Sequence, residues 1–200
     1  MRALNLGCGE FPIDRFENYD IRSFSNTSIN YADVTNEFPF ESDSIDYIYS
    51  KHLIEHLTFV GFANYLYESF RCLKKGGIHR ICFPSLDQIK NMIMHPNDYE
   101  TYFKNELMNF NKIESLEFNF SEYIPYCFVI NNLYTKWNHK NIYDVETIKL
   151  LAKKIGYEDA YDVNLNESNV EIFKNIERIQ NEHHFEMFAK YESNVIELIK

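Results

Sequence analysis

The chain has 200 residues, of which 45% are hydrophobic and 25% are charged, and this composition excludes a wholly disordered protein. Thirty acidic residues against twenty basic ones give a net charge of −10, and no run of lysine and arginine forms a basic arm, so nucleic-acid binding is not expected. The four cysteines lack paired spacing, and no apolar stretch is long enough for a signal or a span. These features predict free thiols, a cytoplasmic protein and no membrane insertion.

Five strands are predicted in the first half of the chain, where short apolar runs end at turn residues. They span Ala3–Leu6, Glu17–Ile21, Ile29–Ala32, Ile45–Ser50 and Ile78–Phe83. Apolar residues at helical spacing predict a helix from Phe59 to Cys72, with Lys74–Gly77 as its stop signal, and Ser85 is suited to begin a helix that runs to about His95. Strands that alternate with helices predict an α/β fold with a mostly parallel sheet covered on both faces.

The second half is less regular. Residues 96–137 are rich in Tyr, Phe and Asn without strand alternation, which predicts a helical, aromatic insertion or lid. A helix is expected from Asp144 to Gly156, followed by a sixth strand at Ala160–Val163. A helical stripe is expected over Ile172–Ile179, and a last strand at Val195–Ile199. We expect one domain over residues 1–200.

Glycine is scarce, with only six in the chain, so each one is expected where another residue would not fit. Gly7 and Gly9 follow the first strand, at the edge where open α/β sheets bind ligands. Asp20 ends the second strand and is placed to accept the hydroxyls of a ribose. Asp33 follows the third strand and is placed to accept an exocyclic amine. A glycine turn and two acids therefore follow three successive strands. This joint pattern favours a nucleoside-binding site over the alternative that each is an unrelated turn residue.

The order of these motifs resembles that of the class I S-adenosylmethionine-dependent methyltransferases. The resemblance rests on LNLGCG (Leu4–Gly9), NYDI (Asn18–Ile21), ADV (Ala32–Val34), FPFESDSIDYIYSKHLIEHL (Phe38–Leu57) and LKKGGIHRICFP (Leu73–Pro84). HKNIYD (His139–Asp144) and GYEDAYDV (Gly156–Val163) extend it. It implies a three-layer Rossmann-like methyltransferase fold with a mostly parallel seven-stranded sheet.

The resemblance also implies which residues bind the cofactor, S-adenosylmethionine. They are Gly7 and Gly9 on the methionine and ribose side, Asp20 at the ribose hydroxyls, Asp33 at the adenine amine, and the neighbouring Asn5, Cys8, Ile21, Val34, Ser50 and Lys51. Asn5 stands where the family usually has an acid, so backbone groups around Gly7 must contribute more. Only ten residues separate Gly9 from Asp20, which is short for a βαβ crossover, so the first helix is expected to be one turn or absent.

Two histidines are candidates for the base that takes a proton from the acceptor, because imidazole titrates near neutral pH. His52 follows the fourth strand, which in the family borders the transferable methyl group. His139 lies in a loop expected over the strand ends, where a structural hydrogen bond to backbone is the competing interpretation. His52 and His56, with Glu55, have a spacing that also suits a metal, but structural packing of the Glu-His pair is favoured, and no metal is expected.

We therefore predict a methyltransferase that acts on a small-molecule or sugar-like (glycan-type) acceptor by O- or N-methylation. Two alternatives remain from the sequence. One is a module that binds S-adenosylmethionine without catalysis, which the substitution at Asn5 keeps open. The other is a nucleotide-binding oxidoreductase, against which the short first crossover argues.

Overall fold

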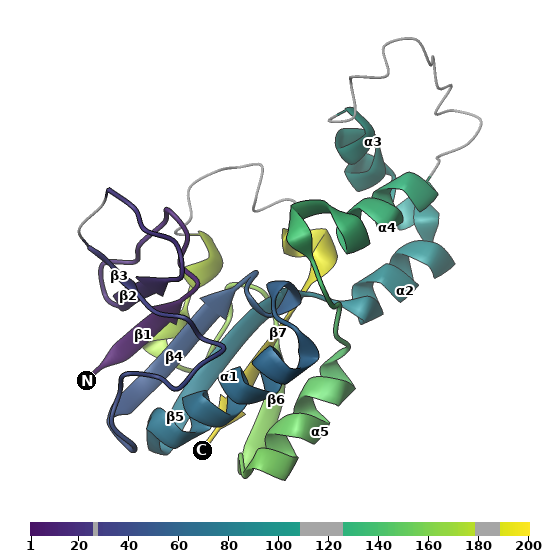
Figure 1. Cartoon of the computed structure of the whole chain (residues 1–200). Coiled ribbons are helices and arrows are strands. Elements are labelled where there is room, and N and C mark those ends of the chain that lie inside the picture. Colours follow the sequence, from purple (N-terminus) through teal and green to yellow (C-terminus); the bar gives the residue numbers. More distant parts are fainter. Residues whose placement is uncertain (26–27, 109–125, 179–188) are drawn as a thin grey trace.

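A single seven-stranded sheet organises the chain in the computed structural model, which describes residues 1–25, 28–108, 126–178 and 189–200 (Figure 1). The strand order is β3-β2-β1-β4-β5-β7-β6, with β7 antiparallel to both of its neighbours and the other pairs parallel. This is the mostly parallel α/β sheet expected from the sequence. The strands are β1 (Ala3–Leu6), β2 (Glu17–Asp20), β3 (Ile29–Tyr31), β4 (Ile45–Lys51), β5 (Leu73–Pro84), β6 (Asp159–Val163) and β7 (Ser193–Ile199).

The first crossover contains no helix, as the short spacing between Gly9 and Asp20 indicates. Residues 7–16 form a loop that is fastened to the sheet by the buried side chain of Asn18. The Asn18 side chain accepts from the Ile13 N–H at 2.8 Å and donates to the carbonyls of Ile13 and Phe16 at 3.1 and 2.9 Å. Ile13 and Phe16 are thereby held in the core, where a helix would otherwise place its apolar side chains.

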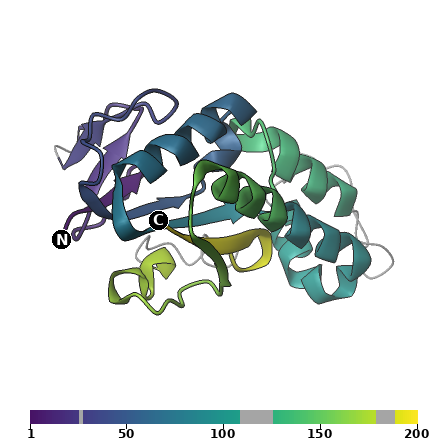
Figure 2. The same ribbon diagram turned by 90° about the horizontal axis from the view of Figure 1, so that it is seen from below.

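The two faces of the sheet are covered in different ways (Figure 2). On one face, α1 (Phe59–Cys72) and α5 (Val145–Ile155) pack against the larger core cluster, which includes Phe62, Leu66 and Ile148. Thr58 and Asp144 begin these helices, each side chain accepting a backbone N–H. On the other face lie the short helices η4 (Glu171–Phe173) and η5 (Ile176–Arg178), with Phe173 and Ile176 in contact with Phe16 and Tyr49 of a second cluster.

Beyond the end of β5 the chain forms a separate helical group at one end of the sheet (Figure 1). It contains α2 (Leu86–Met94), η2 (Pro96–Tyr99), α3 (Glu100–Met108), α4 (Tyr126–Thr135) and η3 (Lys136–Asn138). Its members share a third core cluster that includes Ile89, Tyr102, Phe103 and Val129. The described parts of the 96–137 stretch are thus helical, and residues 109–125 lie outside the described residues. That this group acts as a lid stays a prediction.

Two local expectations were wrong. Helix α1 ends at Cys72 and the chain enters β5 directly at Leu73, so Lys74–Gly77 belongs to the strand and does not terminate the helix. Gly76 has φ of 76° and its N–H donates to the carbonyl of Lys200, which shows that the glycines serve a turn against the chain end. The stripe at Ile172–Ile179 forms two short 3-10 helices, and Ile179 is outside the described residues. No helix among the described residues is long and apolar enough to cross a bilayer.

Candidate functional site

The loop after β1 places bare backbone at the carboxyl edge of the sheet. Gly7 and Gly9 have φ of 69° and 59°, a backbone conformation that residues other than glycine rarely adopt. The N–H groups of Gly7 and Cys8 both donate to the carbonyl of Tyr19, at 2.8 and 3.1 Å. A Cβ atom on Gly7 would lie 2.7 Å from Cδ1 of Leu53, so only glycine fits between this loop and the segment after β4.

Asp20 joins the glycine loop to the end of β2. Its carboxylate is buried, and Oδ2 accepts the N–H of Gly9 at 2.9 Å. Oδ1 accepts the backbone N–H of Arg22 at 2.9 Å and its Nε at 3.1 Å. The Arg22 side chain is 63% exposed, so it lies over the carboxylate from the solvent side. A ligand hydroxyl that reaches Asp20 from the solvent side would therefore replace the Arg22 guanidinium.

The adjoining residues offer an apolar surface beside this acid. Ile21 follows Asp20 and its apolar side chain is 57% exposed, so it is accessible to a ligand at this edge. Val34 is buried in the core, and Asp33 folds back on its own turn. One Asp33 oxygen accepts from the backbone and hydroxyl of Thr35 at 2.9 and 2.7 Å, and the other from the Asn36 amide at 2.8 Å.

The side chains of Asn5 and Cys8 are buried within the protein. Asn5 is buried, and its Nδ2 donates to Oδ1 of Asn18 at 2.9 Å, which connects β1 to the residue that fastens the helix-free crossover. The position at which the family usually has an acid therefore holds an amide that supports the loop. Burial, reinforced by the negative charge of Asp20, raises the pKa of the Cys8 thiol to about 12. Cys8 is thus a protonated thiol at neutral pH and not a nucleophile.

The side chains that end β4 point away from the glycine loop. Ser50 is buried and accepts from the hydroxyl of Tyr65 at 2.8 Å. Lys51 is also buried, and its Nζ donates to the carbonyl of Glu177 at 3.2 Å on the opposite face of the sheet. Any contact of Ser50 or Lys51 with a cofactor at this edge would therefore come from their backbone.

His52 turns the chain out of β4. It has φ of 51°, which is uncommon for a residue with a side chain and often marks a functional position. Its Nε2 is 3.2 Å from the Ser193 hydroxyl, and its Nδ1 is 3.3 Å from Oε1 of Glu55. The contact to Glu55 is within ion-pair distance without meeting hydrogen-bond geometry. His52 therefore faces a carboxylate whose oxygens accept no hydrogen bond among the described residues.

Glu55 carries that carboxylate, in the short helix η1 (Ile54–His56). It is only 1% exposed, and neither carboxylate oxygen has a hydrogen-bond partner among the described residues. Such an arrangement is costly, because a buried charge needs a compensating donor or cation. The hydroxyl of Tyr143 is likewise buried without a hydrogen-bond partner, and burial together with the charge of Glu55 raises the pKa of Tyr143 to about 12.

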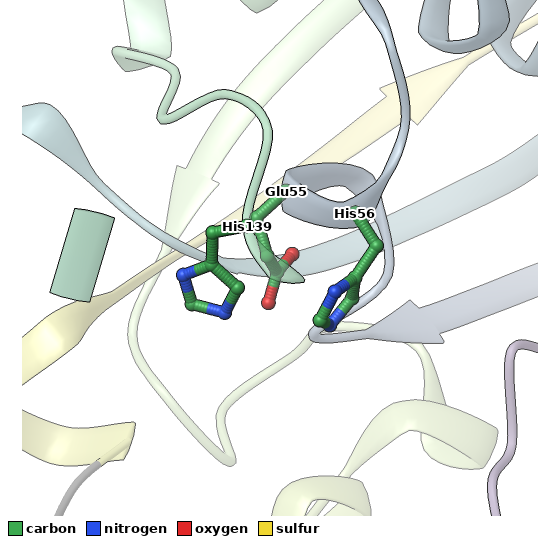
Figure 3. A group of neighbouring side chains, drawn as sticks. All are labelled: Glu55, His56 and His139. Atoms are coloured by element: carbon green, nitrogen blue, oxygen red, sulfur yellow. The ribbon is translucent and has the colours of Figure 1, made fainter. Parts of the chain in front are cut away.

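Backbone hydrogen bonds bring His139 to this carboxylate. The carbonyl of Glu55 accepts the N–H groups of Lys140 and Asn141 at 2.7 and 3.2 Å, and the Asn141 amide donates to the carbonyl of Leu57 at 2.8 Å. Figure 3 shows the Glu55 carboxylate between the imidazole rings of His56 and His139. One potential ligand atom from each of the three residues lies within 4.8 Å of the others.

A backbone carbonyl orients the ring of His139. Its Nδ1 donates to the carbonyl of Leu133 at 2.6 Å, so Nε2 is the ring nitrogen left for another contact. Burial lowers the pKa of His56, against the opposing effect of the Glu55 charge. The two ring centroids are 5.0 Å apart. Both imidazoles are thus positioned beside one buried carboxylate.

The sequence interpretation singled out His52 and His139 separately and did not predict that Glu55, His56 and His139 meet. The missing signal is non-local, because the 139–141 loop joins η1 through backbone hydrogen bonds that no side-chain pattern encodes. Arg22 was also missed, although a cation two residues after the ribose-position acid was a visible signal.

Comparison with known proteins agrees with this geometry. Residues 16–81 match the family model of a methyltransferase domain. A search of the curated proteins finds no match. The fold is similar to that of a SAM-dependent methyltransferase from Archaeoglobus fulgidus (16% identity, TM-score 0.54, covering 100% of this chain and 86% of that one). It is also similar to a possible histamine N-methyltransferase from Thermotoga maritima (18% identity, TM-score 0.52, covering 100% and 82%).

The chain thus shares its fold with these two SAM-dependent methyltransferases, and about a third of it, from β2 to β5, matches a methyltransferase domain. The residues present fit the cofactor: two glycines with positive φ present backbone without side chains, a buried carboxylate accepts the N–H of Gly9 beside them, and the apolar side chain of Ile21 is exposed next to that carboxylate. Together the match and the fold support an enzyme that uses S-adenosylmethionine.

Proposed function

We propose that this methyltransferase acts on a small-molecule or sugar-like acceptor, at an oxygen or a nitrogen atom. S-adenosylmethionine supplies, when bound, an electrophilic methyl group on a sulfonium sulfur. The observation that carries the proposal is the convergence of the glycine loop with the segment 52–56, which meet where a Cβ on Gly7 would contact Leu53. The residues proposed to bind the cofactor and the histidines proposed to act on the acceptor therefore lie at the same edge of the sheet.

The chain's own residues mainly position the reactants, because methyl transfer is an in-line displacement that depends on alignment. Gly7, Cys8 and Gly9, supported by Asn5, would hold the methionine and ribose side. Asp20 would accept the ribose hydroxyls after its pairing with Arg22 opens. Five further residues complete the proposed cofactor site, namely Ile21, Asp33 and Val34 on the adenine side and Ser50 and Lys51 through their backbone.

His52 and His139 are the proposed bases for the proton of the acceptor. His139 would take up the proton at Nε2, because its Nδ1 faces the carbonyl of Leu133. His52 is held between Glu55 and Ser193, and a neighbouring carboxylate stabilises an imidazole that takes up a proton. Neither ring is completely buried, so both can meet a ligand at this edge.

The second candidate function is cofactor binding without catalysis. One observation favours it, namely that Asn5 supports the loop through Asn18 and brings no charge to the methionine end. The two functions differ in a single readout, which is the appearance of a methylated product.

A transfer assay distinguishes them. The purified chain is incubated with S-adenosylmethionine labelled in its methyl group and with panels of sugars, nucleosides, amines and a small-molecule cell extract. We expect label to enter a small acceptor, and we expect His52→Gln or His139→Gln to lower turnover more than it lowers cofactor affinity. Cofactor binding without labelled product from any panel would instead establish the binding module.

A further inference from the structure

The carboxylate of Glu55 is the least satisfied polar group at this edge of the sheet. It is 1% exposed, neither oxygen makes a hydrogen bond among the described residues, and its ion-pair contact is Nδ1 of His52 at 3.3 Å from Oε1. The imidazoles of His56 and His139 lie on either side of it (Figure 3). A buried carboxylate is stabilised by a bound cation, and packing of the Glu-His pair alone leaves both oxygens without a hydrogen bond.

We propose that Glu55, His56 and His139 bind a divalent first-row transition metal ion, with Zn²⁺ as the best match. Two imidazoles and one carboxylate are a ligand set found at catalytic zinc and other transition-metal sites, whereas Mg²⁺ and Ca²⁺ prefer oxygen ligands. This proposal replaces the sequence expectation that no metal is bound.

The surroundings of His139 and the spacing of the ligand atoms support the assignment. Metal-binding histidines characteristically donate their second ring nitrogen to a carbonyl or carboxylate, which fixes the nitrogen that faces the metal. His139 makes such a contact, with its Nδ1 2.6 Å from the Leu133 carbonyl. Ligands of a tetrahedral Zn²⁺ stand roughly 3.4 Å apart, so three ligand atoms within 4.8 Å of one another need a closure of at most about 1.4 Å.

Three protein ligands leave at least one coordination position open, as in catalytic zinc sites. The cluster directly follows β4, and Leu53 of the same segment touches the glycine loop. An oxygen atom of the acceptor is the natural occupant of the open position. This last assignment rests on the proposed function, whereas the metal site itself does not, and it favours hydroxyl over amine acceptors. In this state the Nε2 lone pair of His139 is used by the metal and not as a base.

The test is metal binding by the full chain, measured without cofactor. After dialysis against a chelator, Zn²⁺ affinity is measured by competition with a chromophoric chelator, and Co²⁺ is added as a spectroscopic probe. We expect one Zn²⁺ per chain and visible Co²⁺ absorption bands typical of nitrogen and oxygen ligands. Glu55→Gln and His139→Gln should each weaken Zn²⁺ binding at least about tenfold and abolish the bands.

His95→Gln is the matched control, because His95 is exposed and lies outside the cluster. Its Zn²⁺ affinity and Co²⁺ spectrum should equal those of the wild type. Far-UV circular dichroism of the metal-free proteins checks folding, and His139→Gln, in a loop, decides the outcome if Glu55→Gln is unfolded. The proposal is overturned if the wild type binds no Zn²⁺ at tens of micromolar, or if the cluster variants bind it as the control does. Neither result affects cofactor binding at Asp20, so the two proposals fail separately.

Discussion

His79 is completely buried in β5 between two tyrosines. Its Nε2 is 2.7 Å from the Tyr65 hydroxyl and its Nδ1 is 3.2 Å from the Tyr157 hydroxyl, while Tyr157 also donates to the carbonyl of Leu66. Tyrosine hydroxyls thus lie against both nitrogens of the ring. Burial accordingly lowers the pKa of His79 from 6.5 to about 3.

This shift predicts acid sensitivity. Between pH 6.5 and about 3 the unfolded chain binds a proton at His79 that the folded chain does not, so stability is lost as the pH falls through this window. The contribution approaches about 1.4 kcal/mol per pH unit. Urea unfolding at several pH values should therefore show a shallower loss of stability in His79→Gln than in the wild type. Parallel pH profiles for the two proteins would contradict the assignment.

At the same scale, local motifs made part of the site predictable. Gly7, Gly9 and Asp20 lie within fourteen residues of one another, and each follows a strand whose apolar run is plain in the sequence. Their positions could be predicted because parallel strands end at a common edge. The meeting of Glu55 with His139 could not, because it depends on the path of a loop 84 positions further along the chain.

At the scale of elements, the segment with η4 and η5 takes the place of a covering helix. Arg80, fully buried in β5, fastens it to the sheet: Nε and one terminal nitrogen donate to the Glu177 carboxylate at 2.8 and 3.1 Å. The other terminal nitrogen donates to Glu197 of β7 at 2.5 Å and to the carbonyl of Glu167 at 2.9 Å. Phe173 and Ile176 add apolar contacts on the same face.

Removing the charge of Glu177 should loosen this segment. We expect Glu177→Gln to destabilise the protein by about 3 kcal/mol, because it leaves the buried Arg80 with incomplete compensation. Glu171→Gln is the matched control, since Glu171 is 84% exposed in the same segment and pairs with Lys174 at the surface. Urea unfolding at neutral pH measures both. Equal stabilities of the two variants would show that the Arg80 network does not hold the segment.

The elements themselves were predictable to different degrees. Strands β1 and β4 were expected nearly at their observed bounds, because continuous apolar runs are distinctive. The absence of a first helix followed from chain length alone, since ten residues cannot supply both a helix and its connections. The 3-10 helices at residues 171–178 were mistaken for one longer helix, because the periodicity of so short an apolar stripe does not distinguish the two.

On the scale of the whole molecule, one edge of the sheet collects the residues that bear chemistry. The loop after β1, the end of β2 and the segment after β4 meet there, and the 139–141 loop is bonded to that segment. The opposite edge holds Asp159 at the start of β6, whose direction matches that of β5. The residues that bear chemistry are thus concentrated at one edge of the sheet. Asp159, at the opposite edge, is a charge-matched control for Asp20.

Calorimetric titration with S-adenosylhomocysteine, the demethylated cofactor, tests the central claim most directly. The wild type should bind it, and Asp20→Asn should bind it about 10- to 100-fold more weakly, the loss expected for hydrogen bonds to a charged group. Asp159→Asn should retain wild-type affinity, with circular dichroism confirming that all three proteins are folded. The absence of binding to the wild type at high micromolar ligand, or equal affinities in Asp20→Asn and Asp159→Asn, would contradict the account.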